Sequence, residues 1–124
     1  MEKIKRVISI IDYALKGIPL KENILAEDFF QVVNGRYLSL EKFHNETLLL
    51  RKDNPIIELK ILSMAVSGDC VHSHHLVVTV DSNDQRKRFE VFSRWDFSNG
   101  LVVSCIESLR QMGDDESIDI FFPE

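Results

Sequence analysis

The stretch that follows Pro55 restricts the fold of this chain more than any other part of the sequence. Four segments rich in β-branched and aromatic residues follow one another between residues 56 and 111, and the short sequences SGD, DSNDQ and SNG separate them. Such segments favour strands, and the Gly, Asn, Asp and Ser between them favour turns that join antiparallel neighbours. The pattern therefore predicts a four-stranded antiparallel meander.

The first half of the chain has a mainly helical pattern. Apolar residues at helical spacing predict a first helix that ends near Gly17, and these residues are Ile4, Val7, Ile8, Ile11, Ala14 and Leu15. A second short helix is predicted for residues 19–29 and a short strand for residues 29–33. Ser39 can cap a third helix, because its hydroxyl can accept a hydrogen bond from a free backbone N–H of the first turn.

The predicted order is helix, helix, strand, helix and four strands, which is typical of an α+β domain. A strongly twisted antiparallel sheet with helices on one face tends to wrap into a cone. The length of 124 residues and the hydrophobic fraction of 44% suit one globular domain. We expect a single domain over residues 1–124, with a cone-shaped antiparallel sheet wrapped around the N-terminal helices and a pocket at its open end.

Charge and cysteine content exclude some classes of partner and location. The net charge of −5 argues against nucleic acid, whose binding requires a basic face. Asp12 and Lys16 interrupt the apolar N-terminus, so neither a signal peptide nor a membrane span is expected. Cys70 and Cys105, without an export signal, indicate free thiols in a reducing cytoplasm.

Three stretches carry a resemblance to a known family. They are VNGRYLSLEKF, the turn into the third helix; VSGDCVHSHHLVV, a strand start; and FSRWDFSNGLVVSCIESLRQMGDDES, the paired final strands and an acidic tail. With the order of elements, they resemble the SnoaL-like members of the nuclear transport factor 2-like superfamily. This superfamily includes ketosteroid isomerases, polyketide cyclases, dehydratases and epoxide hydrolases, and also non-enzymatic binding or dimerisation modules. The resemblance implies a pocket inside the cone and no metal.

Period-two alternation predicts which side chains face that pocket. Each of the last three strands has one face that is more uniformly apolar, formed by every second residue. These faces contain Leu76, Phe89 and Val103, and we expect them to point inward. His75 would then point outward. The expected pocket residues are His72, His74, Phe89, Val91, Ser93, Trp95, Cys105 and Glu107.

The inward polar residues allow three interpretations. His72 and His74 form an H-x-H pair that could bind a metal ion with Glu107, although we expect no metal ion or other cofactor. A histidine paired with Glu107 could instead act in acid–base catalysis, with His74 and Glu107 as the first candidates and His72 as the next. In the third interpretation these groups have no chemical role: one histidine lies hydrated near the pocket mouth, and the other forms a hydrogen bond with Glu107 or Ser93. Steroid-isomerase chemistry is not expected, because the first strand offers only Gln31 where those enzymes have an aspartate base.

We therefore expect a protein that binds a small, mostly apolar molecule. It is either an acid–base enzyme of the isomerase, cyclase or dehydratase type, or a non-enzymatic dimerisation or ligand- or partner-binding module. Cys105 is expected to be a buried, inert thiol. The outer sheet face should form a homodimer, because we expect Val77, Phe92, Val102 and Ile106 to lie there and expose too much apolar surface. In the tail, Ile120, Phe121 and Phe122 are expected either to dock or to fray.

Overall fold

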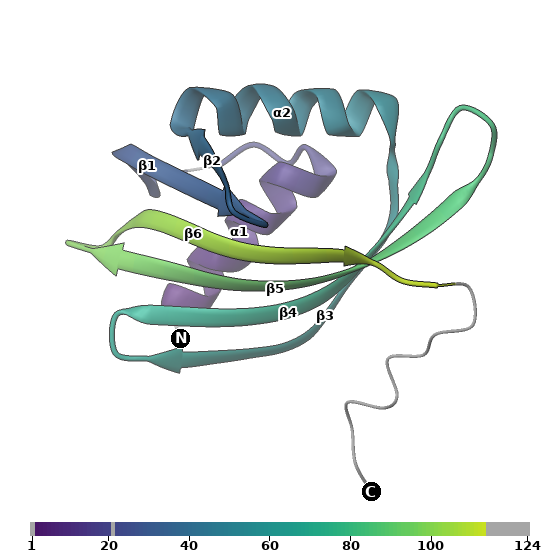
Figure 1. Cartoon of the computed structure of the whole chain (residues 1–124). Coiled ribbons are helices and arrows are strands. Elements are labelled where there is room, and N and C mark those ends of the chain that lie inside the picture. Colours follow the sequence, from purple (N-terminus) through teal and green to yellow (C-terminus); the bar gives the residue numbers. More distant parts are fainter. Residues whose placement is uncertain (1, 21, 114–124) are drawn as a thin grey trace, which may run out of the picture.

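A sheet covered on one face by helices forms the domain in the computed structural model, which describes residues 2–20 and 22–113 (Figure 1). Within these residues, the helices are α1 (Glu2–Lys16) and α2 (Leu40–Asp53). The strands are β1 (Leu25–Val33), β2 (Arg36–Ser39), β3 (Ile56–Ser67), β4 (Cys70–Val80), β5 (Arg86–Ser98) and β6 (Leu101–Gln111). The predicted α+β class is confirmed.

The sheet has the strand order β2-β1-β6-β5-β4-β3. Strands β3 to β6 form the predicted antiparallel meander. Strand β1 also joins the sheet, but it runs parallel to β6, so that the whole sheet is mixed. This pairing brings together segments about 75 residues apart in the chain, such as Gln31 and Cys105, and no local sequence pattern predicts it.

The predicted second short helix over residues 19–29 is wrong, because strand β1 begins at Leu25. Leu25 and Phe29 are buried four residues apart, which imitates one face of a helix. The pairing of β1 with β6 shifts register between Leu25 and Phe30, and the intervening Glu27 and Asp28 are exposed. A bulge of this kind allows an edge segment to bury two apolar residues without helical spacing.

Helix α1 supplies the centre of the hydrophobic core. Its residues Val7, Ile10 and Ile11 are at most 2% exposed. They form a hydrophobic cluster with residues on the sheet face that the helices cover, and these include Val71, Trp95, Phe97, Val102 and Cys105. Burial of large apolar side chains on both layers fixes α1 against this face, since each contributes roughly 1.5–3 kcal/mol.

Helix α2 begins where the sequence predicts it. Ser39 is its N-cap, and the Ser39 hydroxyl accepts a hydrogen bond of 3.3 Å from the backbone N–H of Lys42. The Asn34–Gly35 pair forms the turn between β1 and β2, with positive φ values of 49° and 85°. This turn is tight enough that β2 pairs directly with β1 before α2 starts.

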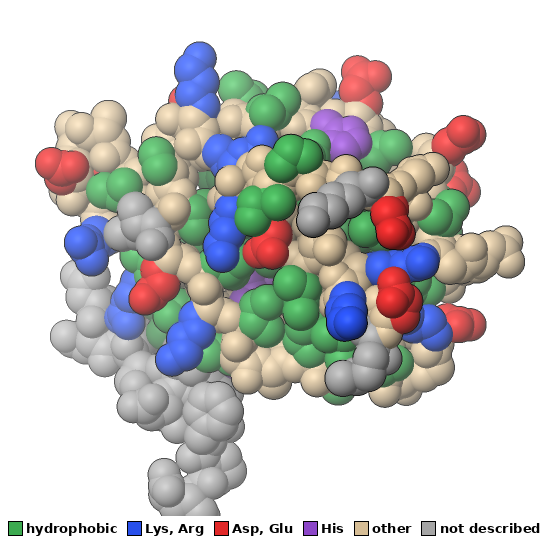
Figure 2. Space-filling view, turned by 180° about the vertical axis from the view of Figure 1, so that it is seen from behind, with side chains coloured by type: hydrophobic (Ala, Val, Ile, Leu, Met, Phe, Trp, Pro, Cys, Tyr) green, Lys and Arg blue, Asp and Glu red, His purple; other side chains and the backbone are tan. Residues whose placement is uncertain are grey.

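Two further features concern the surface and the tail. On the face seen in Figure 2, Lys and Arg side chains are interspersed with Asp and Glu side chains, and apolar groups lie between them. Among the described residues, neither helix is long and apolar enough to cross a membrane. The expected docking or fraying of Ile120, Phe121 and Phe122 lies outside the described residues.

Candidate functional site

A cavity of about 260 Å³ lies between the helices and the sheet. Its wall is mainly apolar and includes Ile11 from α1, Phe43 from α2, and Val77 and Trp95 from the sheet. A smaller group of polar residues lines the same cavity, namely Gln31, Arg36, Glu46, Thr47, His75, Thr79 and Glu107. A mainly apolar wall with a few polar groups is typical of small-molecule sites.

The pairing of β4 with β5 decides which histidine faces the cavity. His75 pairs with Val91, and Val77 pairs with Phe89. Directly paired residues of antiparallel strands point to the same face, and all four of these residues line the cavity. The face predicted for β4 is therefore wrong: His75 faces the cavity, and His72 and His74 lie on the other side of the sheet.

The apolar content of β4 does not identify its inner face, because both faces carry buried valines. Val77 on the cavity side is 5% exposed and Val78 on the opposite side is 6% exposed. The outer-face residues expected for a dimer need the same correction. Val77 lines the cavity and Val102 is completely buried, whereas Phe92 is 44% exposed.

The inner faces of β5 and β6 agree better with the predicted pocket. Phe89, Val91, Trp95 and Glu107 line the cavity wall. Ser93 and Cys105 are buried beside them, 5% and 0% exposed. Ser93 pairs with Glu107 across the two strands, and Cys105 lies two residues before Glu107 on the same face of β6. The structure thus brings together six of the eight expected pocket residues and separates His72 and His74 from them.

Glu107 is half-buried, and its carboxyl group is held by two buried neighbours. The Ser93 hydroxyl donates a hydrogen bond of 2.8 Å to Glu107 Oε1, and the Cys105 thiol lies 3.9 Å from the same oxygen. Burial raises the pKa of the Glu107 carboxyl above its usual range, and the hydrogen bonds from Ser93 and Cys105 oppose this shift. Burial, with the nearby Glu107 charge, also raises the pKa of the Cys105 thiol well above its ordinary value, which suits an unreactive thiol.

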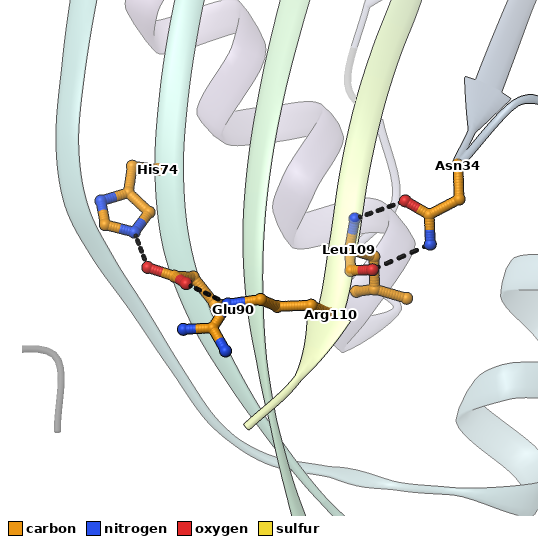
Figure 3. Close-up of polar contacts among 5 residues, drawn as sticks. All are labelled: Asn34, His74, Glu90, Leu109 and Arg110. Carbon is orange, nitrogen blue, oxygen red and sulfur yellow. Dashed lines mark hydrogen bonds and ion pairs between the residues drawn. The ribbon is translucent and has the colours of Figure 1, made fainter. Parts of the chain in front are cut away.

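The backbone around Glu107 is fixed by the turn residue Asn34. The Asn34 backbone N–H donates a hydrogen bond of 3.0 Å to the Glu107 carbonyl. The Asn34 side chain donates to the Leu109 carbonyl at 2.8 Å and accepts from the Leu109 N–H at 2.9 Å, as Figure 3 shows. Asn34 therefore continues the pairing of β1 with β6 beyond the end of β1 and positions the strand that carries Glu107.

His75 is a neutral histidine inside the cavity wall. It is 3% exposed, and burial together with the neighbouring His74 lowers its pKa from 6.5 to about 4. Its Nδ1 atom is buried and has no hydrogen-bond partner among the described residues. Sequence reasoning missed this residue, although the Val77–Phe89 pairing would have identified it.

Two polar pairs lie on the helix side of the site. Arg36 binds Glu46 of α2 through two hydrogen bonds of 2.9 and 2.8 Å, and both residues line the cavity at its exposed edge. The Tyr13 hydroxyl of α1 forms a hydrogen bond of 2.5 Å with Nδ1 of His44 in α2. The second pair links the two helices and is not part of the cavity wall.

The outer face of the sheet contains a separate polar network. His74 Nε2 lies 2.8 Å from Glu90 Oε2, and Arg110 Nε lies 2.8 Å from Glu90 Oε1 (Figure 3). Glu107 faces the cavity instead, so that the conceivable metal site of His72, His74 and Glu107 is not assembled. The described residues also contain no other cluster of three His, Cys, Asp or Glu side chains suited to a metal ion.

Comparison with solved structures identifies the fold. A candidate SnoaL-like polyketide cyclase from Jannaschia sp. CCS1 matches with a TM-score of 0.73 and 12% identity, over 87% of this chain and 85% of that chain. An LEH-like epoxide hydrolase from M. tuberculosis matches with a TM-score of 0.68 and 16% identity, over 88% and 83% of the two chains. A protein from Catenulispora acidiphila DSM 44928 with a ketosteroid isomerase-like fold, solved with trimethylamine, matches with a TM-score of 0.63 and 11% identity, over 80% and 82%.

No protein-family model matches the chain, and no curated protein matches its sequence. The structural matches nevertheless confirm the fold that the resemblance implies: the chain folds like a SnoaL-like polyketide cyclase and like a protein with a ketosteroid isomerase-like fold. Proteins with this fold differ in chemistry, so the function has to be argued from the residues of this cavity.

Proposed function

We propose that the protein binds a small, mostly apolar molecule in the cavity and that Glu107 transfers a proton to or from it. The observation that carries the proposal is the environment of Glu107. Its carboxyl group lines an apolar cavity, and its hydrogen-bond partners among the described residues are the Ser93 hydroxyl and the Cys105 thiol. Because burial raises its pKa towards neutrality, it becomes a stronger general base than an exposed glutamate.

The reaction class that suits this site is isomerisation, cyclisation or dehydration. Each of these reactions includes the removal of a proton from carbon or the protonation of an oxygen, and a single carboxyl group can perform either step in turn. The solved structures with this fold include a candidate polyketide cyclase and an epoxide hydrolase, which supports an acid–base role for the cavity. His74 and His72 take no part in the proposal, since they lie on the other face of the sheet from Glu107.

Deuterium exchange tests the proton transfer without knowledge of the natural substrate. The probe is 4-tert-butylcyclohexanone in D₂O, and NMR follows the exchange of the hydrogens next to its carbonyl. The wild-type protein should accelerate the exchange. Glu107→Gln should lower the accelerated exchange rate at least about 100-fold, because this factor is a typical contribution of a general base. Glu58→Gln, which removes an exposed carboxylate of β3, should leave the rate unchanged.

The rival function is that of a binding module without catalysis. Binding of the ketone with no accelerated exchange would favour this rival and would contradict the role of Glu107. Binding itself is tested by filling the cavity. Val77→Phe should abolish the chemical shift changes that the ketone causes, whereas Val66→Phe, at a residue 44% exposed, should retain them.

We also propose that the protein forms a homodimer through the outer face of its sheet. Phe92 supports this assignment, because its ring is 44% exposed and stacks on His74 with the ring centres 4.1 Å apart. Light scattering should give the mass of two chains, and Phe92→Glu should give the mass of one. Leu48→Glu, at an exposed residue of α2, should remain dimeric. A monomeric wild-type protein at micromolar concentration would refute the assignment.

A cytoplasmic location is the third part of the proposal. Cys70 and Cys105 are both free thiols, which fits a reducing compartment. Cell fractionation with a thiol-reactive label would test it, and recovery of the protein from an oxidising compartment would contradict it.

A further inference from the structure

The charges on the cavity wall restrict the kind of ligand. Arg36 is the cationic side chain that lines the cavity within the described part of the chain, and it donates two hydrogen bonds to Glu46. An anionic ligand would therefore meet a cation only at the exposed edge of the cavity, where the Glu46 carboxylate already offsets the charge of Arg36. The deeper groups, His75 and Glu107, both have pKa values moved by burial towards the neutral form. A low-dielectric wall of this kind disfavours a charged ligand of either sign.

Most polar atoms around the cavity that could bind a ligand already have partners within the protein. The Trp95 indole donates to Ser73 Oγ at 3.0 Å, and the Gln31 amide lies 3.9 Å from the Cys105 sulfur. The Thr47 hydroxyl donates to the His44 carbonyl at 2.9 Å. These internal contacts reduce the number of places where a ligand gains a new hydrogen bond.

His75 differs from these residues. Its side chain is among the cavity-lining residues, it is 97% buried, and Nδ1 has no partner among the described residues. A buried polar atom without a partner costs roughly 1–3 kcal/mol, and such atoms in folded proteins usually mark a missing water, ion or ligand. Nδ1 itself has almost no exposed surface, so a ligand in the cavity that His75 lines reaches it only after a small rotation of the imidazole.

The volume limits the size of that ligand. Since one water molecule occupies about 30 Å³ of liquid, a cavity of about 260 Å³ corresponds to roughly nine waters. A molecule of roughly ten non-hydrogen atoms fills a space of this size, whereas a four-ring skeleton of about twenty carbon atoms exceeds it.

Building on the small-molecule pocket proposed above, we propose that the ligand is an uncharged molecule of roughly ten non-hydrogen atoms with a hydroxyl group that hydrogen-bonds to the imidazole of His75. A neutral imidazole has one donor and one acceptor nitrogen, and a hydroxyl can accept from the first or donate to the second. A hydroxyl therefore satisfies His75 in either tautomer. His75 acts as a specificity residue in this proposal, and proton transfer remains with Glu107.

The experiment compares 4-tert-butylcyclohexanol with tert-butylcyclohexane, which has the same ring and branch without the hydroxyl. Dissociation constants are measured by ligand-detected NMR for the wild type, His75→Leu and His72→Leu. His75→Leu should weaken the alcohol about tenfold and change the hydrocarbon less than twofold, because only the alcohol loses a hydrogen bond to a buried group. His72→Leu, on the opposite face, should change neither.

A second set of probes tests the absence of charge. At pH 7, 4-tert-butylcyclohexanecarboxylate and 4-tert-butylcyclohexylamine should both bind at least tenfold more weakly than the alcohol. If His75→Leu does not fold, the ring nitrogen resonances of ¹⁵N-labelled His75 in the wild type replace it. These resonances should move when the alcohol is added and stay in place with the hydrocarbon.

The outcomes separate this inference from the proposed function. Equal weakening of alcohol and hydrocarbon by His75→Leu, unchanged His75 resonances, or a carboxylate that binds as tightly as the alcohol would overturn the inference while the pocket proposal survives. If none of these probes binds to the wild type, both proposals fail.

Discussion

The imidazole of His74 lies 2.8 Å from the carboxylate of Glu90, on the face of the sheet that points away from the cavity. Glu90 is 1% exposed, and its second oxygen accepts a hydrogen bond of 2.8 Å from Arg110. Glu90 on β5 thus connects β4 to β6 through side chains, in addition to the backbone pairing of the three strands. A buried carboxylate tolerates this position only while its partners remain.

The first prediction follows from this network. Glu90→Ala removes the shared partner of His74 and Arg110 and leaves a space in a buried layer, so the free energy of unfolding should fall by roughly 3 kcal/mol. Urea unfolding at neutral pH measures the change. The control is Glu46→Ala, which removes an arginine partner at the exposed edge of the cavity and should cost much less. Equal losses in the two variants would mean that burial of Glu90 has no special role.

The same pair of residues explains why part of the site could not be predicted from the sequence. Alternation correctly separates His74 from His75, but it does not say which of the two faces the helices. On β5 the choice was clear, because Phe89, Val91 and Trp95 alternate with Glu90, Phe92 and Arg94. On β4 both alternating sets contain valines, since part of the outer face, at His74 and Val78, is also buried.

Strand register contains the information that composition lacks. In an antiparallel pair the residue numbers of partners add to a constant, and the whole β4–β5 ladder runs without a shift, from Cys70 opposite Asp96 to Val80 opposite Arg86. Odd-numbered residues of β4 must then share a face with odd-numbered residues of β5. Once Trp95 is placed inside, His75 has to be inside as well. The prediction of His74 in the cavity violated this rule.

Turn and cap residues were predicted more reliably, because their signals are local. Ser39 at the start of α2 and the Asn34–Gly35 turn are visible in a few neighbouring letters. The parallel pairing of β1 with β6 depends on residues at opposite ends of the chain, and for this reason the sequence did not reveal β1 as a long strand.

The second prediction concerns Asn34. Asn34→Ala and Asn99→Ala both place alanine at a positive φ before a glycine, with native φ values of 49° and 53°. Only Asn34 also bonds a neighbouring strand through its side chain within the described residues. Asn34→Ala should therefore destabilise the protein by roughly 1 kcal/mol more than Asn99→Ala. Thermal and urea unfolding check this difference, and equal effects would show that the bonds to Leu109 contribute nothing.

The third prediction concerns the pH dependence due to His75. The pKa of His75 is about 4 in the folded protein and near 6.5 in the unfolded chain. Between these values the unfolded chain binds more protons, so the stability due to this group is complete above pH 6.5 and is lost as the pH falls to 4. The loss should reach roughly 3 kcal/mol.

Unfolding free energies from pH 7 to pH 4 measure this effect. His75→Leu should be less sensitive to acid than the wild type, because the group that must bind a proton on unfolding has gone. Thr79→Val alters another buried residue of the cavity wall and should keep the wild-type slope. A His75→Leu variant with the full wild-type slope would rule out the neutral buried histidine.

The fourth prediction has the opposite sign and concerns Glu107. Burial raises the pKa of this carboxyl in the folded protein above the ordinary value of 4.5, so that between the two values the folded protein binds more protons than the unfolded chain. Its contribution to stability therefore falls as the pH rises above about 4.5, and it stays low above the raised pKa. Glu107→Gln removes this loss, and the amide oxygen can still accept the Ser93 hydrogen bond. The variant should become more stable than the wild type as the pH rises, with the difference constant at high pH.

The matched control for Glu107 is Glu46→Gln. The hydrogen bond from Arg36 lowers the pKa of Glu46, so this carboxylate stabilises the folded protein above its ordinary pKa, and its replacement should reduce stability on the alkaline side. The two variants should thus diverge in opposite directions from the wild type between pH 4 and pH 8 in urea unfolding. If Glu107→Gln instead loses stability at neutral pH, Glu107 is stabilised as a carboxylate, and its role as a general base with a raised pKa would have to be abandoned.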